Sequence, residues 1–172
     1  EQDAGRRGDG GRGTPRGRHD AGPFGRRRQG RAVASECGRL YTKGPRDMKP
    51  SESLFFDLKG VRMHVRAWGD PADPLVVMLH GWMDTCASFQ FTVDAMKGRW
   101  RVLAPDWRGH GRSSRSPDGI YTYFGHLADL DALLEIVSPD APVRLVGHSL
   151  GGNIACHFAA ARPERARAVV SV

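Results

Sequence analysis

One serine in this sequence stands where it could act as a nucleophile. The segment Val143-Arg-Leu-Val-Gly-His-Ser-Leu-Gly-Gly152 runs from apolar residues into Gly-x-Ser-x-Gly, and a helical pattern follows it. Gly147 and Gly151 permit a turn so tight that Ser149 takes strained dihedrals and its hydroxyl is lifted clear of the strand. The backbone N–H of Leu150 would then point to the space beside the hydroxyl, at the positive end of a helix dipole. This strand, turn and helix context predicts a nucleophile elbow.

Two other segments stand where apolar runs end. His80-Gly81-Trp82 follows the run at residues 75 to 79, and Pro105-Asp-Trp-Arg-Gly-His-Gly-Arg-Ser113 continues from the run at residues 100 to 104. Together with the serine turn, these segments resemble the motifs of the α/β-hydrolase superfamily in order and spacing. The resemblance covers about residues 53 to 172, which would be the N-terminal portion of the catalytic domain.

The resemblance implies roles for the residues of the His-Gly-Trp turn. The backbone N–H of Trp82 would be the second oxyanion donor, and Gly81 would let the chain turn so that this N–H faces Ser149. The imidazole of His80 is expected to brace loops and not to act as a base. The indole of Trp82 would either line an acyl pocket or pack in the core.

The segment from Pro105 to Ser113 is typical of the family but does not itself indicate a catalytic residue. Asp106 precedes the serine in the chain, so we expect it to support its loop and not to be the triad acid. A partly buried ion pair between Asp106 and Arg108 is the predicted means of support. His110 and His126 are expected to be structural or to face solvent.

The implied chemistry is acyl transfer to water by a carboxylesterase-like serine hydrolase. Ser149 would attack an ester or related carbonyl of a small-molecule acyl substrate, the N–H groups of Trp82 and Leu150 would hold the oxyanion, and water would resolve the acyl-enzyme. No metal and no organic cofactor is needed. A serine at this position argues against the dehalogenase and epoxide hydrolase branches, whose nucleophile is a carboxylate. The alternatives are an acyltransferase or carbon-carbon bond hydrolase of the same fold, or a non-catalytic binding protein.

The acid and the histidine of the family's triad follow the serine in the chain. After Ser149 the sequence offers only Glu164 and His157. His157 lies eight residues along the same predicted helix, roughly 12 Å along its axis, which is beyond hydrogen-bond reach. We therefore expect this chain to be an incomplete and inactive fragment, truncated after about the sixth strand and poorly soluble.

The elements that must position these residues follow from the hydrophobic pattern. A Lys59-Gly60 turn between residues 54 to 58 and 61 to 68 predicts a hairpin. Continuous apolar runs predict buried strands. Apolar residues that recur at intervals of three or four predict helices with one apolar stripe, and the segment from Phe124 to Val137 shows this most clearly. The strands are expected at residues 75 to 79, 100 to 104, 143 to 146 and 168 to 172, and the helices at 89 to 96, 123 to 137 and 150 to 161. This alternation predicts an α/β fold with a mostly parallel sheet and flanking helices, whose chemistry lies at the carboxyl ends of the strands.

The basic excess of the chain lies wholly in its first 50 residues. They hold 13 of the 26 Lys and Arg residues and 6 of the 19 acidic residues, which accounts for the net charge of +7. With 11 Gly and few aliphatic side chains, residues 1–50 are expected to be disordered, and residues 51–172 to form the hydrolase domain. The first methionine is Met48, so translated upstream DNA or an inert tail is favoured over a nucleic-acid tail or a targeting role. Nucleic-acid binding is not the expected function because residues 51 to 172 carry no net charge.

Composition also restricts the location. No apolar stretch approaches the roughly 18 to 20 residues of a membrane span, and the Arg-rich start is unlike a signal peptide. Cys37, Cys86 and Cys156 are odd in number and widely spaced, which favours neither disulfides nor a zinc site. A reducing, cytoplasmic location is the expectation.

Overall fold

The computed structural model describes residues 48–58 and 60–172. The expected disorder of residues 1–50 and the expected start at Met48 therefore fall almost wholly outside the described residues. In the described part, no helix is long and apolar enough to cross a membrane.

Six strands form one sheet in the order β1-β2-β4-β3-β5-β6. β1 and β2 form the predicted hairpin, and β2 pairs antiparallel with β4. β4, β3, β5 and β6 run parallel to one another. The strands are β1 Ser51–Leu58, β2 Val61–Trp68, β3 Leu75–Leu79, β4 Arg101–Pro105, β5 Val143–Gly147 and β6 Ala166–Ser171. The predicted α/β fold with a mostly parallel sheet is confirmed.

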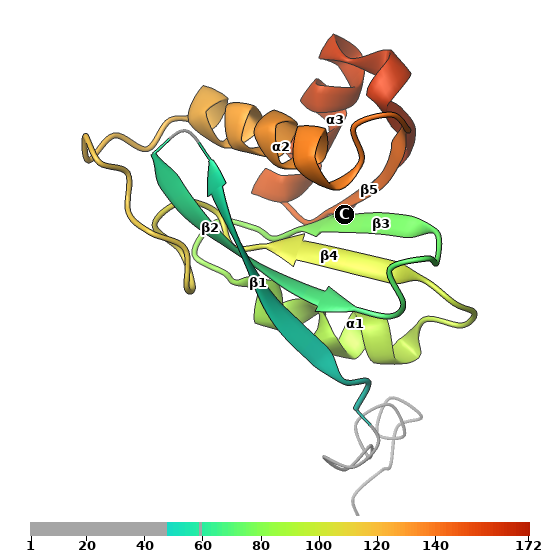
Figure 1. Cartoon of the computed structure of the whole chain (residues 1–172). Coiled ribbons are helices and arrows are strands. Elements are labelled where there is room, and N and C mark those ends of the chain that lie inside the picture. Colours follow the sequence, from blue (N-terminus) through green and yellow to red (C-terminus); the bar gives the residue numbers. More distant parts are fainter. Residues whose placement is uncertain (1–47, 59) are drawn as a thin grey trace, which may run out of the picture. The chain divides into compact units, whose positions relative to one another are not determined.

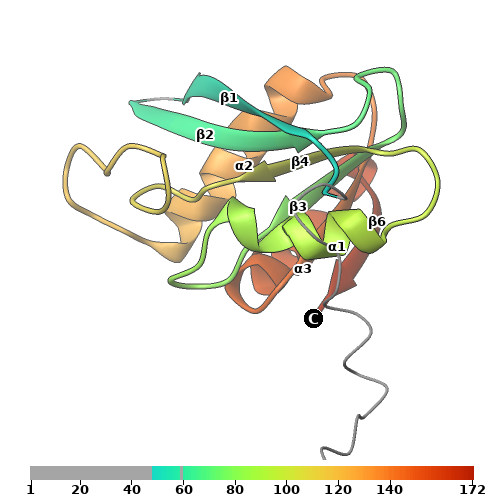
Figure 2. The ribbon, with the colours of Figure 1, turned by 90° about the horizontal axis from the view of Figure 1, so that it is seen from below.

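Helices cover both faces of this sheet (Figures 1 and 2). α2 (Tyr123–Val137) and α3 (Leu150–Ala161) lie on one face, and α1 (Gln90–Ala95) lies on the other. A short 3-10 helix, η3 (Cys86–Phe89), leads into α1, and another, η4 (Pro163–Arg165), follows α3. The helix expected over residues 89 to 96 is thus split, with its first residue belonging to the 3-10 turn.

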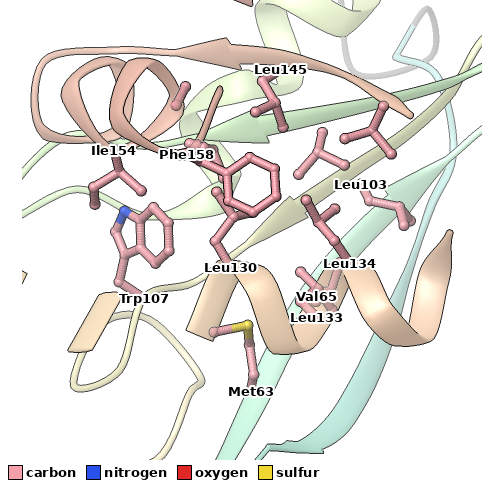
Figure 3. Close-up of a cluster of buried hydrophobic side chains, with 14 of the residues drawn as sticks. Met63, Val65, Leu103, Trp107, Leu130, Leu133, Leu134, Leu145, Ile154 and Phe158 are labelled. Atoms are coloured by element: carbon pink, nitrogen blue, oxygen red, sulfur yellow. The ribbon is translucent and has the colours of Figure 1, made fainter. Parts of the chain in front are cut away.

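The larger core lies between the sheet and the helices α2 and α3 (Figure 3). Odd-numbered residues of β2 face this side, because side chains alternate along a strand. The labelled side chains of Figure 3 are Met63, Val65, Leu103, Trp107, Leu130, Leu133, Leu134, Leu145, Ile154 and Phe158. A second cluster, which includes Trp68, Val76 and Phe89, lies under η3 and α1.

The apolar stripe predicted for α2 is wrong at its start. Leu130, Leu133 and Leu134 are fully buried, whereas Phe124 is 75% exposed. Phe124 instead lines a surface hollow with Leu127 of the same helix and Phe158 and Ala161 of α3, whereas its neighbour Tyr123 packs against the larger core. Thr122 caps this turn by accepting a hydrogen bond from the N–H of Gly125.

Candidate active site

Ser149 occupies the turn between β5 and α3 with a strained backbone. Its φ is 52° and its ψ is −113°, a combination of backbone angles that residues other than glycine rarely adopt. Two main-chain hydrogen bonds hold the turn: the N–H of Ser149 donates to the carbonyl of Val172 (2.8 Å), and that of His148 donates to Leu79 (3.0 Å). The surrounding sheet therefore fixes the strained residue, as is typical of functional turns.

The two glycines of the motif allow backbone segments to approach closely. A Cβ atom on Gly147 would lie 2.4 Å from the carbonyl carbon of Gly151. A Cβ atom on Gly151 would lie 2.1 Å from the carbonyl oxygen of Leu79. Both separations are far shorter than a van der Waals contact, so helix α3 can sit this close to β3 and β5 only with glycine at both positions.

The turn after β3 lies against this elbow. A Cβ atom on Gly81 would be 2.9 Å from Nδ1 of His148 and 3.4 Å from Cβ of Ser149. Among the described residues, the backbone N–H groups of Trp82 and Leu150 donate to no acceptor, and the Ser149 hydroxyl has no hydrogen-bond partner. The N–H of Leu150 thus follows the exposed serine at the N-terminus of a 12-residue helix, and the Gly81 turn, which leads into Trp82, packs against the same serine.

His80 is fully buried and both of its ring nitrogens are engaged. Nε2 accepts the backbone N–H of Trp107 at 3.0 Å, so the proton must sit on Nδ1, which donates to the carbonyl of Gly81 at 2.7 Å. Burial lowers the pKa of His80, against the opposing effect of the Gly81 hydrogen bond. The neutral imidazole therefore ties the turn after β3 to the loop after β4, and it has no nitrogen left to act as a base.

Trp82 lies on the surface, 58% exposed, so the alternative in which its indole packs in the core is wrong. The indole meets the ring of His110 edge-on, with centroids 5.3 Å apart. Behind His110 lies His126, buried to 2% exposure, with no partner for either ring nitrogen among the described residues. Burial lowers the pKa of His126 to about 4. His126 does not face solvent, and its neutral ring packs 5.4 Å from the indole of Trp107.

The predicted ion pair between Asp106 and Arg108 is wrong. Asp106 is buried beneath the end of β4, where it accepts the backbone N–H groups of Cys86 (2.7 Å) and Arg112 (2.9 Å). Arg108 instead forms a bidentate pair with Asp129 of α2, at 2.7 and 2.6 Å. The physical reason is that main-chain donors and a histidine already satisfy Asp106, while α2 presents a free carboxylate to the guanidinium.

Sequence reasoning missed His64 and Asp129, which hold the same loop. Nδ1 of His64 lies 2.7 Å from Oδ2 of Asp106, and both side chains are almost fully buried. The available signal was a polar residue inside an apolar pattern, because His64 stands in the middle of β2 and Asp129 on the buried side of α2.

One group of described side chains offers metal-type ligand atoms close together: His64, Cys86 and Asp106, within 4.8 Å of one another. Burial raises the pKa of the Cys86 thiol to about 12, so the sulfur stays protonated, whereas metals bind the thiolate. The contact between His64 and Asp106 has the length of a hydrogen bond. Hydrogen bonding accounts for the compactness of this cluster.

Comparisons with known proteins agree on the fold. The family model described as alpha/beta hydrolase fold matches residues 74–172. A serine hydrolase-like protein of Danio rerio is 37% identical over 106 residues, or 61% of this chain and 32% of the relative. Epoxide hydrolase A of Mycobacterium tuberculosis is 36% identical over 126 residues, or 72% of this chain and 38% of that protein. A thioesterase domain from the curacin biosynthetic pathway superposes with a TM-score of 0.64 at 31% identity, covering 72% of this chain and 46% of that one. The chain thus spans between 32% and 46% of the length of these three proteins.

Proposed function

Because the chain belongs to the alpha/beta hydrolase fold family, we propose that it carries the nucleophile and the oxyanion donors of a serine hydrolase for ester or related acyl substrates. The observation that carries the proposal is the strained, exposed Ser149 at the start of α3. Its hydroxyl has no partner among the described residues, and the Gly81 turn packs against it.

In the proposed reaction, the Ser149 oxygen attacks the acyl carbonyl carbon and the carbonyl π electrons move onto oxygen. The N–H groups of Trp82 and Leu150 stabilise this oxyanion by hydrogen bonds. Collapse expels the leaving group with a proton, and water then cleaves the acyl-serine bond. Both donors belong to rigid backbone, so they need no reorganisation when the charge develops.

A general base must also take the serine proton, and the described residues after Ser149 supply none in position. Nδ1 of His157 is bonded to the hydroxyl of Tyr123 at 2.5 Å. Glu164 is paired with Arg162 at 3.1 Å. In this family the acid and the histidine follow the serine along the chain. We therefore expect residues 1–172 alone to hydrolyse esters no faster than background.

Acyl chemistry is favoured over epoxide opening, although epoxide hydrolases are among the relatives. The epoxide hydrolases of this family use a carboxylate nucleophile, and this chain has Ser149 at the corresponding elbow. The structural likeness to a thioesterase domain also points to acyl transfer. Acyl transfer to another acceptor, carbon-carbon bond hydrolysis and non-catalytic binding are the alternatives that the test must separate.

The test is carried out on the natural protein that contains residues 48–172. We expect a fluorophosphonate to label the Ser149 peptide rapidly and a short p-nitrophenyl ester to be hydrolysed. Ser149→Ala should lower hydrolysis by at least about a thousandfold, since removing a serine nucleophile leaves only binding and oxyanion effects. Ser51→Ala, which alters an exposed serine of β1, is the matched control. Hydrolysis that survives Ser149→Ala would refute the assignment, and labelling without hydrolysis would favour the binding protein or another acyl acceptor.

A further inference from the structure

A second serine, on β1, is bonded to a buried histidine and aspartate. Oγ of Ser53 lies 2.9 Å from Nε2 of His64, and Nδ1 of His64 lies 2.7 Å from Oδ2 of Asp106. Ser53 is exposed, whereas His64 and Asp106 are each only 1% exposed. A hydroxyl at the surface is thus connected through one imidazole to a buried carboxylate.

The protons in this chain of hydrogen bonds can be assigned. Burial disfavours the charge on Asp106, but hydrogen bonds from the N–H groups of Arg112 and Cys86 and from His64 outweigh it, and the pKa of Asp106 is lowered. An ionised carboxylate can only accept, so Nδ1 of His64 carries a proton, and in the neutral imidazole Nε2 then holds a lone pair. In this neutral tautomer the Ser53 hydroxyl donates to Nε2, which is the arrangement that lets a histidine act as general base.

Rigid elements hold these groups in place. In the β1–β2 register Ser53 is opposite Arg66 and Phe55 is opposite His64, so Ser53 and His64 are diagonal neighbours on one face of the hairpin. Asp106 is fixed to the same strand because its N–H donates to the carbonyl of His64 at 2.8 Å. Neither the base nor the acid has to move for proton transfer.

A positive charge lies beside the hydroxyl. Nη1 of Arg112 donates to Oγ of Ser53 at 2.8 Å. The guanidinium groups of Arg62 and Arg112 also lie over the ring of Phe55, at 4.5 and 5.2 Å from its centroid. A cation this close stabilises negative charge that develops on or next to Oγ. The other ionisable neighbour of His64 is the thiol of Cys86, whose Sγ is 3.7 Å from Nδ1.

We propose that Ser53 is a second acyl-accepting serine of this chain, which takes a small acyl group from activated esters with His64 as general base and Asp106 as its positioning group. Oγ of Ser53 attacks the ester carbonyl carbon as its proton passes to Nε2 of His64, and the bond to the leaving oxygen then breaks as His64 returns that proton to it. The products are an O-acyl serine and the free alcohol or phenol. We expect the ester to persist long enough to be mapped, because the imidazole of His64, which would have to activate water for its hydrolysis, is only 1% exposed.

The experiment uses the whole chain with Ser149→Ala, so that the proposed elbow nucleophile cannot contribute. The protein is treated with p-nitrophenyl acetate near neutral pH, and acetylated peptides are mapped by mass spectrometry over time. Ser51 is the internal control, because it is exposed on the same strand and its side chain has no hydrogen bond among the described residues. We expect Ser53 to be acetylated at least about a hundredfold faster than Ser51, since general base catalysis contributes roughly that much.

Two variants separate activation from mere exposure. His64→Gln should remove the advantage of Ser53 over Ser51, and Arg112→Met should lower it several-fold while leaving the bond between His64 and Asp106 in place. If His64→Gln fails to fold, the Arg112→Met chain, which keeps the bond between His64 and Asp106, decides between activation and exposure. Equal rates at Ser53 and Ser51, or an Arg112→Met chain with unchanged selectivity, would overturn the proposal.

Discussion

Gly151→Ala tests whether close contact between α3 and β3 sets the geometry of the elbow. The added Cβ atom would lie 2.1 Å from the carbonyl oxygen of Leu79 and 2.8 Å from that of His80. An ordinary contact begins near 3.4 Å, so helix and strand must separate by about 1.3 Å, and both partners are backbone atoms that cannot rotate away. Overpacking against backbone atoms that cannot rotate away costs about 3 kcal/mol, the upper end of the usual range, and it is offset by about 1 kcal/mol because alanine favours a helix. We expect a net loss of about 2 kcal/mol in the free energy of unfolding.

Urea denaturation followed by circular dichroism measures this loss. With a slope of about 1–3 kcal/mol per molar for a small domain, the midpoint should fall by roughly 1 M. Gly125→Ala is the matched control: it also lies in the first turn of a helix, but its nearest neighbour is a hydroxyl oxygen at 3.2 Å in the side chain of Thr122, which can shift. We expect that control to be neutral or slightly stabilising. Equal shifts in the two variants would show that the contact with β3 does not restrain the turn.

Three further predictions concern buried polar groups. The pKa of His126 is about 4 in the folded chain and near 6.5 in the unfolded chain, so the unfolded state binds a proton first as pH falls, and the free energy of unfolding should drop by about 3 kcal/mol from pH 7 to pH 4. In urea titrations across this range, the free energy of unfolding of His126→Leu should fall less. An equal fall in the two chains would contradict the burial argument. Asp129→Asn should lower the free energy of unfolding by about 3 kcal/mol at pH 7, because it leaves the guanidinium of Arg108 without its bidentate partner. A loss under 1 kcal/mol in the same assay would mean that the ion pair between Arg108 and Asp129 contributes little to stability. In thiol titration of the native chain, exposed Cys156 should react with iodoacetamide, whereas Cys86, which is buried and has a pKa raised to about 12, should react only on unfolding. Prompt alkylation of Cys86 would mean that the segment around η3 opens in the native state.

The sequence predicted those parts of the fold that depend on neighbours along the chain. A continuous apolar run such as β3 predicts a strand buried on both faces. Burial on both faces is typical of a central strand in a parallel sheet, whereas a strand with one face in solvent alternates apolar and polar residues. The turn at Ser149 is local in part, since Gly147 and Gly151 approach each other within the motif, whereas the clash of a Cβ atom on Gly151 would be with Leu79 of β3. The family and the mostly parallel sheet, predicted from these patterns, are confirmed.

The partners of the buried polar groups could not be read from the sequence. Asp106 and Arg108 are two residues apart and of opposite charge, yet each finds a partner far along the chain: His64 is 42 residues from Asp106, and Asp129 is 21 from Arg108. Likewise, the exposure of Phe124 depends on how α2 packs against α3, which the helical pattern by itself does not fix. Pattern and turn chemistry are set by local sterics and solvation, which the sequence determines by itself. Hydrogen bonds between distant segments, such as the one that joins His64 to Asp106, exist only because the tertiary fold brings their atoms within 3 Å, and only the structure decides them.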